Sequence, residues 1–148
     1  ERSRDVCRTP MQWDASPNAG FCPPEVEPWL PVTADYKTRN VAVMSQDPTS
    51  ILTLYHQLLA LCQETPALFG GRYRPVDAGV PSDCYVYVRE ADGSRYLIAL
   101  NFAAEPRTLA LVEAEEGRIL LSTHLDREEP ATLGALQLRA YEGVIIAL

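Results

Sequence analysis

The apolar pattern of the sequence changes its period at Gly70-Gly71. Before this pair, between Ile51 and Cys62, apolar residues recur at helical spacing. After it, short runs alternate with a period of two and are separated by turn residues. A helix and a strand need these two different periods to present one apolar face. The sequence therefore predicts two zones, residues 1–69 and 70–148.

The second zone predicts a small antiparallel β-sandwich. Asp92-Gly93 lies between two alternating runs, and this dipeptide is the strongest short-range signal of a hairpin. About seven short strands recur at spacings of roughly eight to twelve residues, which is typical of a sandwich. The predicted strands cover residues 72–76, 84–90, 95–102, 107–112, 118–122, 135–139 and 143–148.

The first zone begins with a long irregular segment, residues 1–46, which carries both tryptophans. Irregular segments of this length in compact proteins are usually functional. A helix then follows, with Asp47 as N-cap and Pro48 at the first helical position, and it ends at Thr65-Pro66. Its packed face is predicted from an apolar stripe and two flanking leucines. The stripe is Ile51, Tyr55, Leu58, Leu59 and Cys62, flanked by Leu54 and Leu61.

Charge and cysteine spacing exclude several classes of protein. The net charge of -7 argues against nucleic acid and acidic membranes as partners, and leaves neutral partners such as sugars open. We expect no membrane span and no signal peptide within these residues. The four cysteines form no Cys-x-x-Cys pair, so we expect neither a metal site nor a cofactor. Free thiols of a reducing compartment are favoured over a bridge between Cys7 and Cys22.

The carboxylates and histidines form no recognisable catalytic set. General acid and base roles need two carboxyl groups held at a defined separation, and nothing in the sequence shows such a pair. The acidic turns 113–116 and 126–129 are interpreted as solvated loops. His56 is expected on a helix surface and His124 in a turn, without a serine or cysteine partner. The sequence therefore predicts no catalytic residue in this chain.

The opening segment 3–14 is unusually rich in charged and aromatic groups. An arginine offers a planar fork of donors to carboxylates and vicinal hydroxyls, and a tryptophan offers a face to a sugar ring. Arg4, Asp5, Arg8 and Trp13 could thus shape a polar pocket. An ion-paired loop packed by Trp13 and Met11 explains the same residues equally well.

The stretch Ser-Arg-Asp-Val-Cys-Arg-Thr-Pro-Met-Gln-Trp-Asp at residues 3–14 resembles the signature of α-glucosidases in the α-amylase superfamily, glycoside hydrolase family 13. Further stretches match densely through the first half, and the match is looser from residue 72 onward. They are Asn18-Ala-Gly-Phe21, Pro28-Trp-Leu-Pro31, Asn40-Val41, the helix start at Asp47-Pro48 with Ser50, Leu54-Tyr55 with Leu58, and Pro66-Ala-Leu68. Val6 is the one departure within the signature, at a tolerant position.

The resemblance implies that residues 1–69 are the end of a (β/α)8 catalytic barrel, namely the loop after its eighth strand and its eighth helix. Residues 70–148 would be the C-terminal β-sandwich. The parent protein would be a retaining α-glucosidase that hydrolyses terminal α-linked glucose from oligosaccharides. The strand that carries the family's nucleophile is absent from this sequence, so the chain alone should be inactive.

For the site, the resemblance implies that an arginine of this loop helps to fix the non-reducing glucose. Arg4 is the first choice and Arg8 the second, while Asp5, Gln12 and Trp13 are assigned to the scaffold. The expected partners are an α-glucoside oligosaccharide and the missing catalytic barrel, and the isolated chain is expected to self-associate or to bury its helix face on the β domain. We expect a cytoplasmic location, or an extracellular one if the parent carries a signal peptide.

Two other functions fit the same residues. Heavy subunits of amino-acid transporters resemble these glucosidases without being enzymes, and they share Met-Gln-Trp-Asp, Asn-Ala-Gly-Phe and Trp-Leu-Pro. The complete Arg4-Asp5 with Arg8 favours the enzyme. A carbohydrate-binding β-sandwich is the third reading, and it is weaker because its visible aromatic residues have ordinary cross-strand explanations. Those residues are Tyr85, Tyr87, Tyr96 and Phe102.

Overall fold

A computed structural model describes residues 4–148 of the chain. It separates into two compact units, Glu1–Thr53 and Leu54–Leu148. Most of helix α2 (Ile51–Glu64) therefore belongs to the same unit as the strands. The predicted division after residue 69 concerns the domains of a longer protein and stays a prediction.

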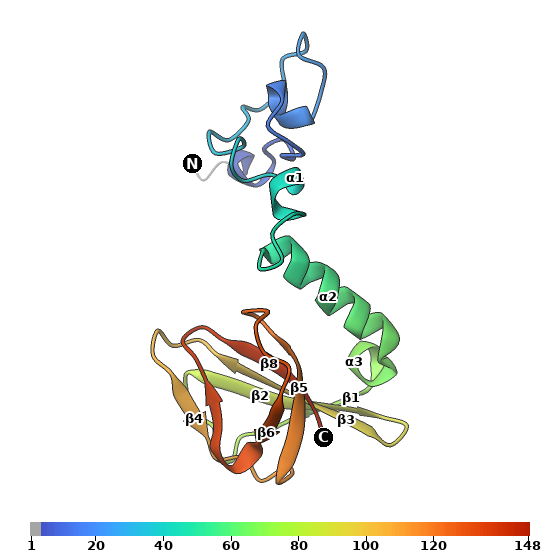
Figure 1. Ribbon diagram of the computed structural model, residues 1–148, viewed down its shortest axis with the longest axis vertical. Helices are drawn as coiled ribbons and strands as arrows, with labels where there is room; N and C mark the ends of the chain where they lie inside the picture. The colour runs from blue at the N-terminus through green and yellow to red at the C-terminus, as the bar shows by residue number, and fades with distance from the viewer. Residues whose placement is uncertain (1–3) are drawn as a thin grey trace. The chain divides into compact units, whose positions relative to one another are not determined.

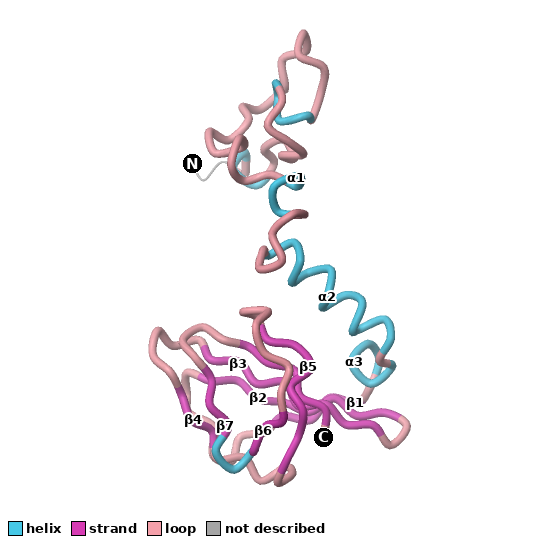
Figure 2. The backbone as a smooth tube through the Cα atoms, in the orientation of Figure 1, coloured by secondary structure: helices cyan, strands magenta, loops and turns pink. Residues whose placement is uncertain are grey.

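The second unit is built on two antiparallel sheets, as Figures 1 and 2 show. The larger one has the strand order β1-β2-β3-β8-β5-β6, and the smaller pairs β4 with β7. The strands of the larger sheet are β1 (Arg72–Pro75), β2 (Cys84–Ala91), β3 (Ser94–Asn101), β5 (Glu116–Ser122), β6 (Pro130–Thr132) and β8 (Gly143–Ala147). Those of the smaller are β4 (Arg107–Leu109) and β7 (Leu136–Leu138), with the 3-10 turn η3 (Leu133–Ala135) before β7. The predicted mainly β, antiparallel sandwich is confirmed.

The hairpin between β2 and β3 forms at Asp92-Gly93 as predicted. Both residues have positive φ, 50° and 80°, which a two-residue turn of this handedness requires. The turn sets the register, with Ala91 opposite Ser94. Strand β6, which begins with Pro130, was not predicted, because a proline within an apolar run argues against a strand unless it lies at an edge. In the structure β6 is such an edge strand.

Both faces of the large sheet are covered by apolar side chains. On β3, Leu97 and Ala99 point into the core between the sheets, while Ile98 points to the opposite face. Residues two apart on a regular strand point to the same face, but a bulge in β5 lies between Ile119 and Leu121. Ile119 therefore points into the inner core, and Leu121 points to the opposite face. The inner core consists of Val76, Cys84, Val86, Val88, Leu97, Ala99, Leu109, Leu111, Ile119, Leu133, Leu136, Leu138, Val144 and Ile146. Double coverage explains why these strands are nearly continuous apolar runs.

Helix α2 begins later than the sequence predicted. Asp47 Oδ1 accepts the backbone N–H of Thr49 (2.8 Å) and so caps a turn before the helix. The N-cap bond of the helix itself is made by Ser50, whose Oγ accepts the N–H of Thr53 (3.1 Å). The prediction that Asp47 caps the helix and Pro48 opens it is therefore wrong. The predicted end is confirmed at Glu64, and a short helix α3 (Pro66–Gly70) follows, with the proline at its first position.

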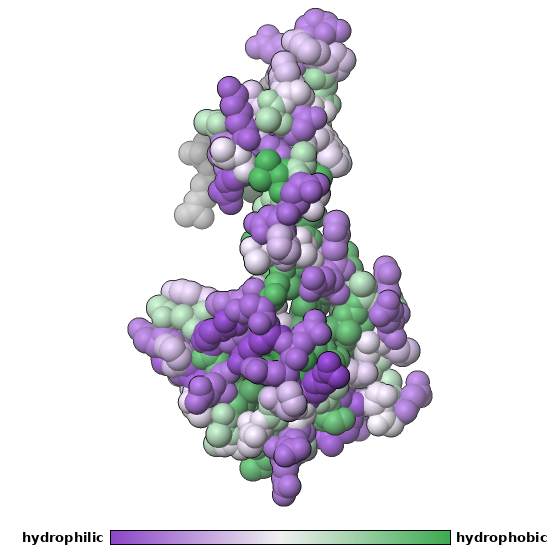
Figure 3. Space-filling model, viewed as in Figure 1, coloured by the Kyte–Doolittle hydropathy of each residue, from purple (hydrophilic) through white to green (hydrophobic). Residues whose placement is uncertain are grey.

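The face of α2 that packs on the sheet is not the one centred on the predicted stripe. Leu54, Leu58 and Leu61 pack on the outer face of the large sheet. Ile51, Tyr55 and Leu59 remain exposed, by 72%, 62% and 48%. Figure 3 shows apolar side chains gathered where α2 lies over the sheet. Among the described residues, no helix is long and apolar enough to cross a membrane.

The first unit is irregular, as expected. It contains the 3-10 turns η1 (Asp5–Cys7) and η2 (Pro17–Gly20) and the one-turn helix α1 (Val41–Met44). Few of its side chains are buried. Backbone hydrogen bonds between segments distant in sequence hold this unit together instead. Trp13 and Trp29 remain exposed by 50% and 80%.

Candidate functional site

The motif loop, residues 4–14, presents Arg4 and Arg8 to solvent on either side of η1. The carbonyl of Arg4 accepts the N–H of Cys7 (3.1 Å), and the N–H of Arg8 donates to the carbonyl of Asp5 (2.9 Å). Both arginine side chains are exposed, and within residues 4–148 neither forms a salt bridge. Two permanently charged donor forks thus lie on one short turn. Met11 and Trp13 are each half exposed, so these two side chains pack the loop only in part.

The Asn-Ala-Gly stretch at 18–20 clamps the end of the motif loop. All three residues have positive φ, between 56° and 67°, so the chain turns sharply and points the carbonyl of Ala19 back. That carbonyl accepts the N–H of Trp13 (2.9 Å) and of Asp14 (3.3 Å). A Cβ at Gly20 would lie 2.9 Å from the carboxylate oxygens of Asp14, so any other residue would force Asp14 to shift and would strain the backbone at positive φ. The turn thereby fixes the backbone at Trp13 and Asp14.

Two aspartates stiffen this frame rather than offering proton-transfer groups. Asp14 accepts the hydroxyl and the backbone N–H of Ser16, and these bonds lower its pKa. Asp35 accepts Gln12 Nε2 (3.3 Å), and the nearby Thr33 hydroxyl and this bond lower its pKa. Both carboxyl groups are therefore ionised at neutral pH and hold backbone turns in place. Gln12 thus contacts Asp35 within this frame, and its scaffold role stays a prediction.

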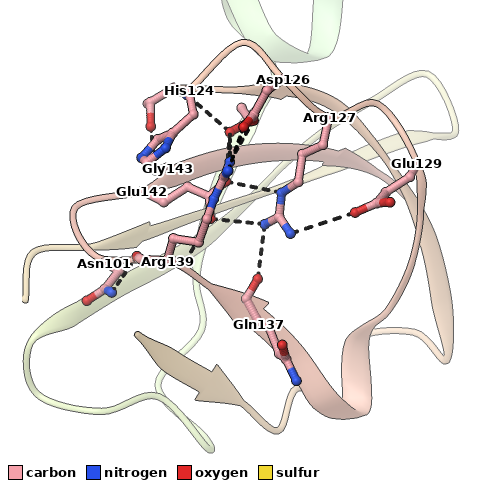
Figure 4. A network of polar contacts seen from close by, with 11 residues as sticks. Asn101, His124, Asp126, Arg127, Glu129, Gln137, Arg139, Glu142 and Gly143 are labelled. Carbon is pink, nitrogen blue, oxygen red and sulfur yellow. Dashed lines mark hydrogen bonds and ion pairs between the residues drawn. The ribbon is translucent and has the colours of Figure 1, made fainter. Parts of the chain in front are cut away.

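A second polar cluster lies in the β-sandwich around Glu142, which the sequence analysis did not single out as a candidate. The Glu142 side chain is completely buried. Its Oε1 accepts Ser122 Oγ (2.7 Å) and one terminal nitrogen of Arg139 (2.7 Å). Its Oε2 accepts the Arg139 backbone N–H (2.8 Å) and Arg127 (3.2 Å). Figure 4 shows both arginines converging on this carboxylate, with Asp126 on the outer side of Arg139.

The cluster is a structural lock and not an acid–base pair. Burial alone would raise the pKa of Glu142, but hydrogen bonds from Arg139 and Ser122 and the charge of Arg127 lower it to about 2. Hydrogen bonds from Arg139 lower the pKa of Asp126 to about 2 as well. A general acid needs a raised pKa, so neither carboxyl group can donate a proton near neutral pH. The sequence carried no signal for Glu142, since its partners Ser122 and Arg127 are 20 and 15 positions away and come near only in the fold.

The two acidic turns are only partly solvated, which corrects the sequence interpretation. Glu113 retains 14% side-chain exposure and accepts Arg74 (2.5 Å), with Arg95 3.5 Å away. The hydrogen bond from Arg74 lowers the pKa of Glu113. Asp126 pairs with Arg139 as described, whereas Glu115 and Glu128 are exposed as expected. His56 and His124 are both exposed, on α2 and in a turn, as predicted.

An apolar groove and the four thiols offer no catalytic chemistry. An apolar groove of about 520 Å³ runs between α2 and the sheet, lined mainly by leucines, isoleucines and Tyr87. Cys7, Cys22, Cys62 and Cys84 are free, and Cys84 lies in the sandwich core. Among the described residues, no group of histidine, cysteine or carboxylate side chains is arranged to hold a metal ion. The motif loop is therefore the candidate site.

Comparisons with known proteins show what the two parts of the chain resemble. Residues 1–71 match a family described as alpha amylase, catalytic domain, and residues 85–142 match one described as beta-galactosidase C-terminal domain. An oligo-1,6-glucosidase of Halalkalibacterium halodurans is 35% identical over 144 residues, which is 95% of this chain and 25% of that protein. An α-glucosidase of Schizosaccharomyces pombe is 41% identical over 103 residues, 69% of this chain and 18% of that protein.

The chain belongs to the α-glucosidase branch of glycoside hydrolase family 13. Among solved structures, the trehalulose synthase MutB of Pseudomonas mesoacidophila MX-45 is 37% identical, with a TM-score of 0.84 over 98% of this chain and 26% of that one. This family 13 chain thus spans about a quarter of the length of the relatives that it matches most fully. The resemblance recognised from the motif loop is confirmed.

Proposed function

We propose that this chain is the C-terminal part of a retaining α-glucosidase that hydrolyses terminal α-linked glucose from oligosaccharides. The observation that carries the proposal is the motif loop, which holds two exposed arginines that form no salt bridge with any residue of 4–148, on a frame of backbone hydrogen bonds. The names of the similar proteins, α-glucosidase and oligo-1,6-glucosidase, support the reaction class. The catalytic carboxylates belong to the part of the parent protein that lies outside these residues.

Arg4, with Arg8 as the second candidate, binds the glucose unit that is released. A guanidinium presents several N–H donors in one plane, which matches neighbouring sugar hydroxyls and a carboxylate of the surrounding site. Its charge-assisted hydrogen bonds are worth about 1.5–3 kcal/mol each when a partner is removed. The frame around Trp13 and Asp14 keeps the loop ordered before substrate arrives, which lowers the cost of binding.

Kinetics of the full-length parent protein with p-nitrophenyl α-glucoside test the proposal. Arg4→Ala should lower kcat/KM by about 10- to 100-fold, because a hydrogen-bonded charge is lost from the glucose. Arg39→Ala is the matched control, since Arg39 is also an exposed arginine of the same unit but pairs with Asp35. It should stay within about twofold of the wild type.

Three results would overturn the proposal. They are no α-glucoside hydrolysis by the full-length protein, wild-type kinetics for both Arg4→Ala and Arg8→Ala, or turnover by the isolated chain. The first would favour a non-enzymatic relative such as a transporter subunit. A cytoplasmic location of the parent stays a prediction, and fractionation of the source cells would test it.

The exposed stripe of α2 provides the contact with the rest of the catalytic domain. Ile51, Tyr55 and Leu59 follow one another at a spacing of four on a helix within the residues that match the catalytic-domain family. Such a stripe is unfavourable in water. The isolated chain should therefore self-associate, and light scattering at increasing concentration should show it. A Leu59→Gln variant should shift the chain toward a monomer, and an unchanged wild-type monomer at all concentrations would contradict this contact.

A further inference from the structure

Asn40 is a buried amide that lies 26 positions beyond the end of the motif loop in sequence but next to it in space. Only 3% of Asn40 is exposed. Its Oδ1 accepts the backbone N–H of Val43 (2.9 Å) and so caps α1. Its Nδ2 donates to the carbonyl of Tyr36 (2.8 Å). Both ends of the amide are therefore used, and few other side chains offer an acceptor and a donor at this spacing.

The amides that open α1 are donated to the motif loop. The first N–H groups of a helix have no carbonyl partner within the helix. Here the N–H of Val41 donates to the carbonyl of Gln12, and the N–H of Ala42 to the carbonyl of Trp13, both at 3.0 Å. Because Asn40 caps the turn, it fixes the direction in which these two amides point.

The backbone of Gln12 and Trp13, which these amides hold, is close in sequence to the two exposed arginines of the motif loop. Between Arg8 and Gln12 lie only three residues, and one of them, Pro10, is buried and has a fixed φ. On its other side, Trp13 is held by the Ala19 carbonyl. A shift of Gln12 and Trp13 would therefore pass to the turn that carries Arg8 and Arg4.

We propose that Asn40 is a positioning residue for the substrate-binding arginines. It acts through the amides of Val41 and Ala42 on the backbone of Gln12 and Trp13. The proposal rests on the proposed function in one respect, that Arg4 or Arg8 contacts the sugar. The hydrogen-bonded bridge between α1 and the motif loop does not depend on that function.

Kinetics of the full-length parent protein with p-nitrophenyl α-glucoside provide the first test. Asn40→Ala should lower kcat/KM at least tenfold at a temperature where circular dichroism shows the variant folded. Asn40→Asp, which keeps the acceptor for Val43 but loses the donor to the Tyr36 carbonyl, should recover part of the loss. Ser45→Ala is the matched control. Ser45 lies at the C-terminal end of α1, away from Asn40, and its Oγ donates to the Val41 carbonyl (2.7 Å). The kcat/KM of this variant should stay within twofold of the wild type. Wild-type kinetics for Asn40→Ala would overturn the proposal.

A double-mutant cycle separates positioning from a general loss of stability. If Asn40 acts through Arg4, adding Asn40→Ala to Arg4→Ala should lower kcat/KM by less than threefold, and the cycle is repeated with Arg8→Ala. Full multiplication of the losses in both cycles would overturn the proposal. Should Asn40→Ala fail to fold, the same cycles are made with Asn40→Gly, which also removes the amide but is better tolerated at an N-cap position, and the same criterion decides.

Hydrogen exchange tests the bridge without reference to activity. In Asn40→Ala the amides of Val41 and Ala42 should exchange at least ten times faster than in the wild type, and in Ser45→Ala they should not. If exchange is unchanged, the bridge does not depend on Asn40 and the proposal fails. If exchange rises but neither arginine variant alters kinetics, the proposed function fails while the bridge stands.

Discussion

The motif loop and the β-sandwich use arginine in opposite ways. In the sandwich, Arg74, Arg107 and Arg139 each bind a carboxylate of the same unit, at 2.5 to 2.6 Å. In the motif loop, Arg4 and Arg8 form no salt bridge within the described residues. The sandwich pairs these three arginines and buries a large apolar core, whereas the motif loop leaves Arg4 and Arg8 without a carboxylate partner among the residues that the structure describes. A charged group that the fold itself does not use is free to serve a ligand.

The two units also differ in what holds them together. The sandwich is stabilised by its apolar core and by the buried cluster of ion pairs around Glu142. The first unit is stabilised by backbone hydrogen bonds in turns, and few of its side chains are buried. Both tryptophans lie in the first unit, at positions 13 and 29. Tryptophan fluorescence therefore reports on the first unit, and circular dichroism of the strands reports on the second. Together the two signals test whether the units behave independently.

The largest effect is expected from Glu142→Ala in this chain. Removing the carboxylate leaves Arg127 and Arg139 without their buried partner, which should cost about 3–5 kcal/mol in the free energy of unfolding of the sandwich. Urea titration followed by circular dichroism measures the loss. The tryptophan signal should keep its midpoint.

Glu115→Ala provides the control for that experiment, because Glu115 is an exposed glutamate of the same unit. It should change the free energy of unfolding by no more than about 0.5 kcal/mol. A loss below 1 kcal/mol for Glu142→Ala would mean that the lock is not a stabilising element.

Acid should weaken the sandwich as pH falls from about 5 to 2. The pKa values of Glu142 and Asp126 are about 2 in the folded chain, below the ordinary 4.5 and 3.8. The unfolded state therefore takes up protons first, so the contribution of these groups is complete above the ordinary pKa and is lost toward pH 2. Urea titrations across this range should show the decline, and Glu142→Gln should flatten it. An equal slope in Glu142→Gln would contradict the assignment.

A smaller effect is expected from two glycine substitutions, one in each unit. Gly93 has open space around its missing Cβ, so Gly93→Ala should cost only the strain of positive φ, about 1 kcal/mol in the sandwich. Gly20→Ala adds a clash with Asp14 to that strain, and its larger cost should appear in the tryptophan signal alone. If Gly20→Ala also lowered the midpoint of the strand signal, the two units would not be independent.

The sequence predicted those elements whose signals are local. Asp92-Gly93 determines its own hairpin because a positive φ at two adjacent residues is a property of the turn itself. Thr65-Pro66 ends the helix for the same kind of reason. The N-cap was misassigned because Asp47 and Ser50 both accept backbone amides, and only the packing of α2 decides which amides belong to the helix.

The candidate site likewise has one part that a local sequence pattern reveals and one part that only the folded structure reveals. The motif loop could be recognised from its letters, because Arg4, Arg8, Gln12 and Trp13 are neighbours in the chain. The roles of Asn40 and Gly20 could not, since their partners at Gln12, Trp13 and Asp14 come near only when the chain folds back.

By itself the sequence determined the sandwich, the helix and the motif that identifies the family. These depend on periodicity, turn residues and short contiguous patterns, which are all expressed over a few residues. The tertiary structure alone decided which face of α2 packs on the sheet and which carboxylates are buried. It also decided which residues hold the motif loop. Burial and pairing depend on groups that are distant in sequence, so no local pattern encodes them.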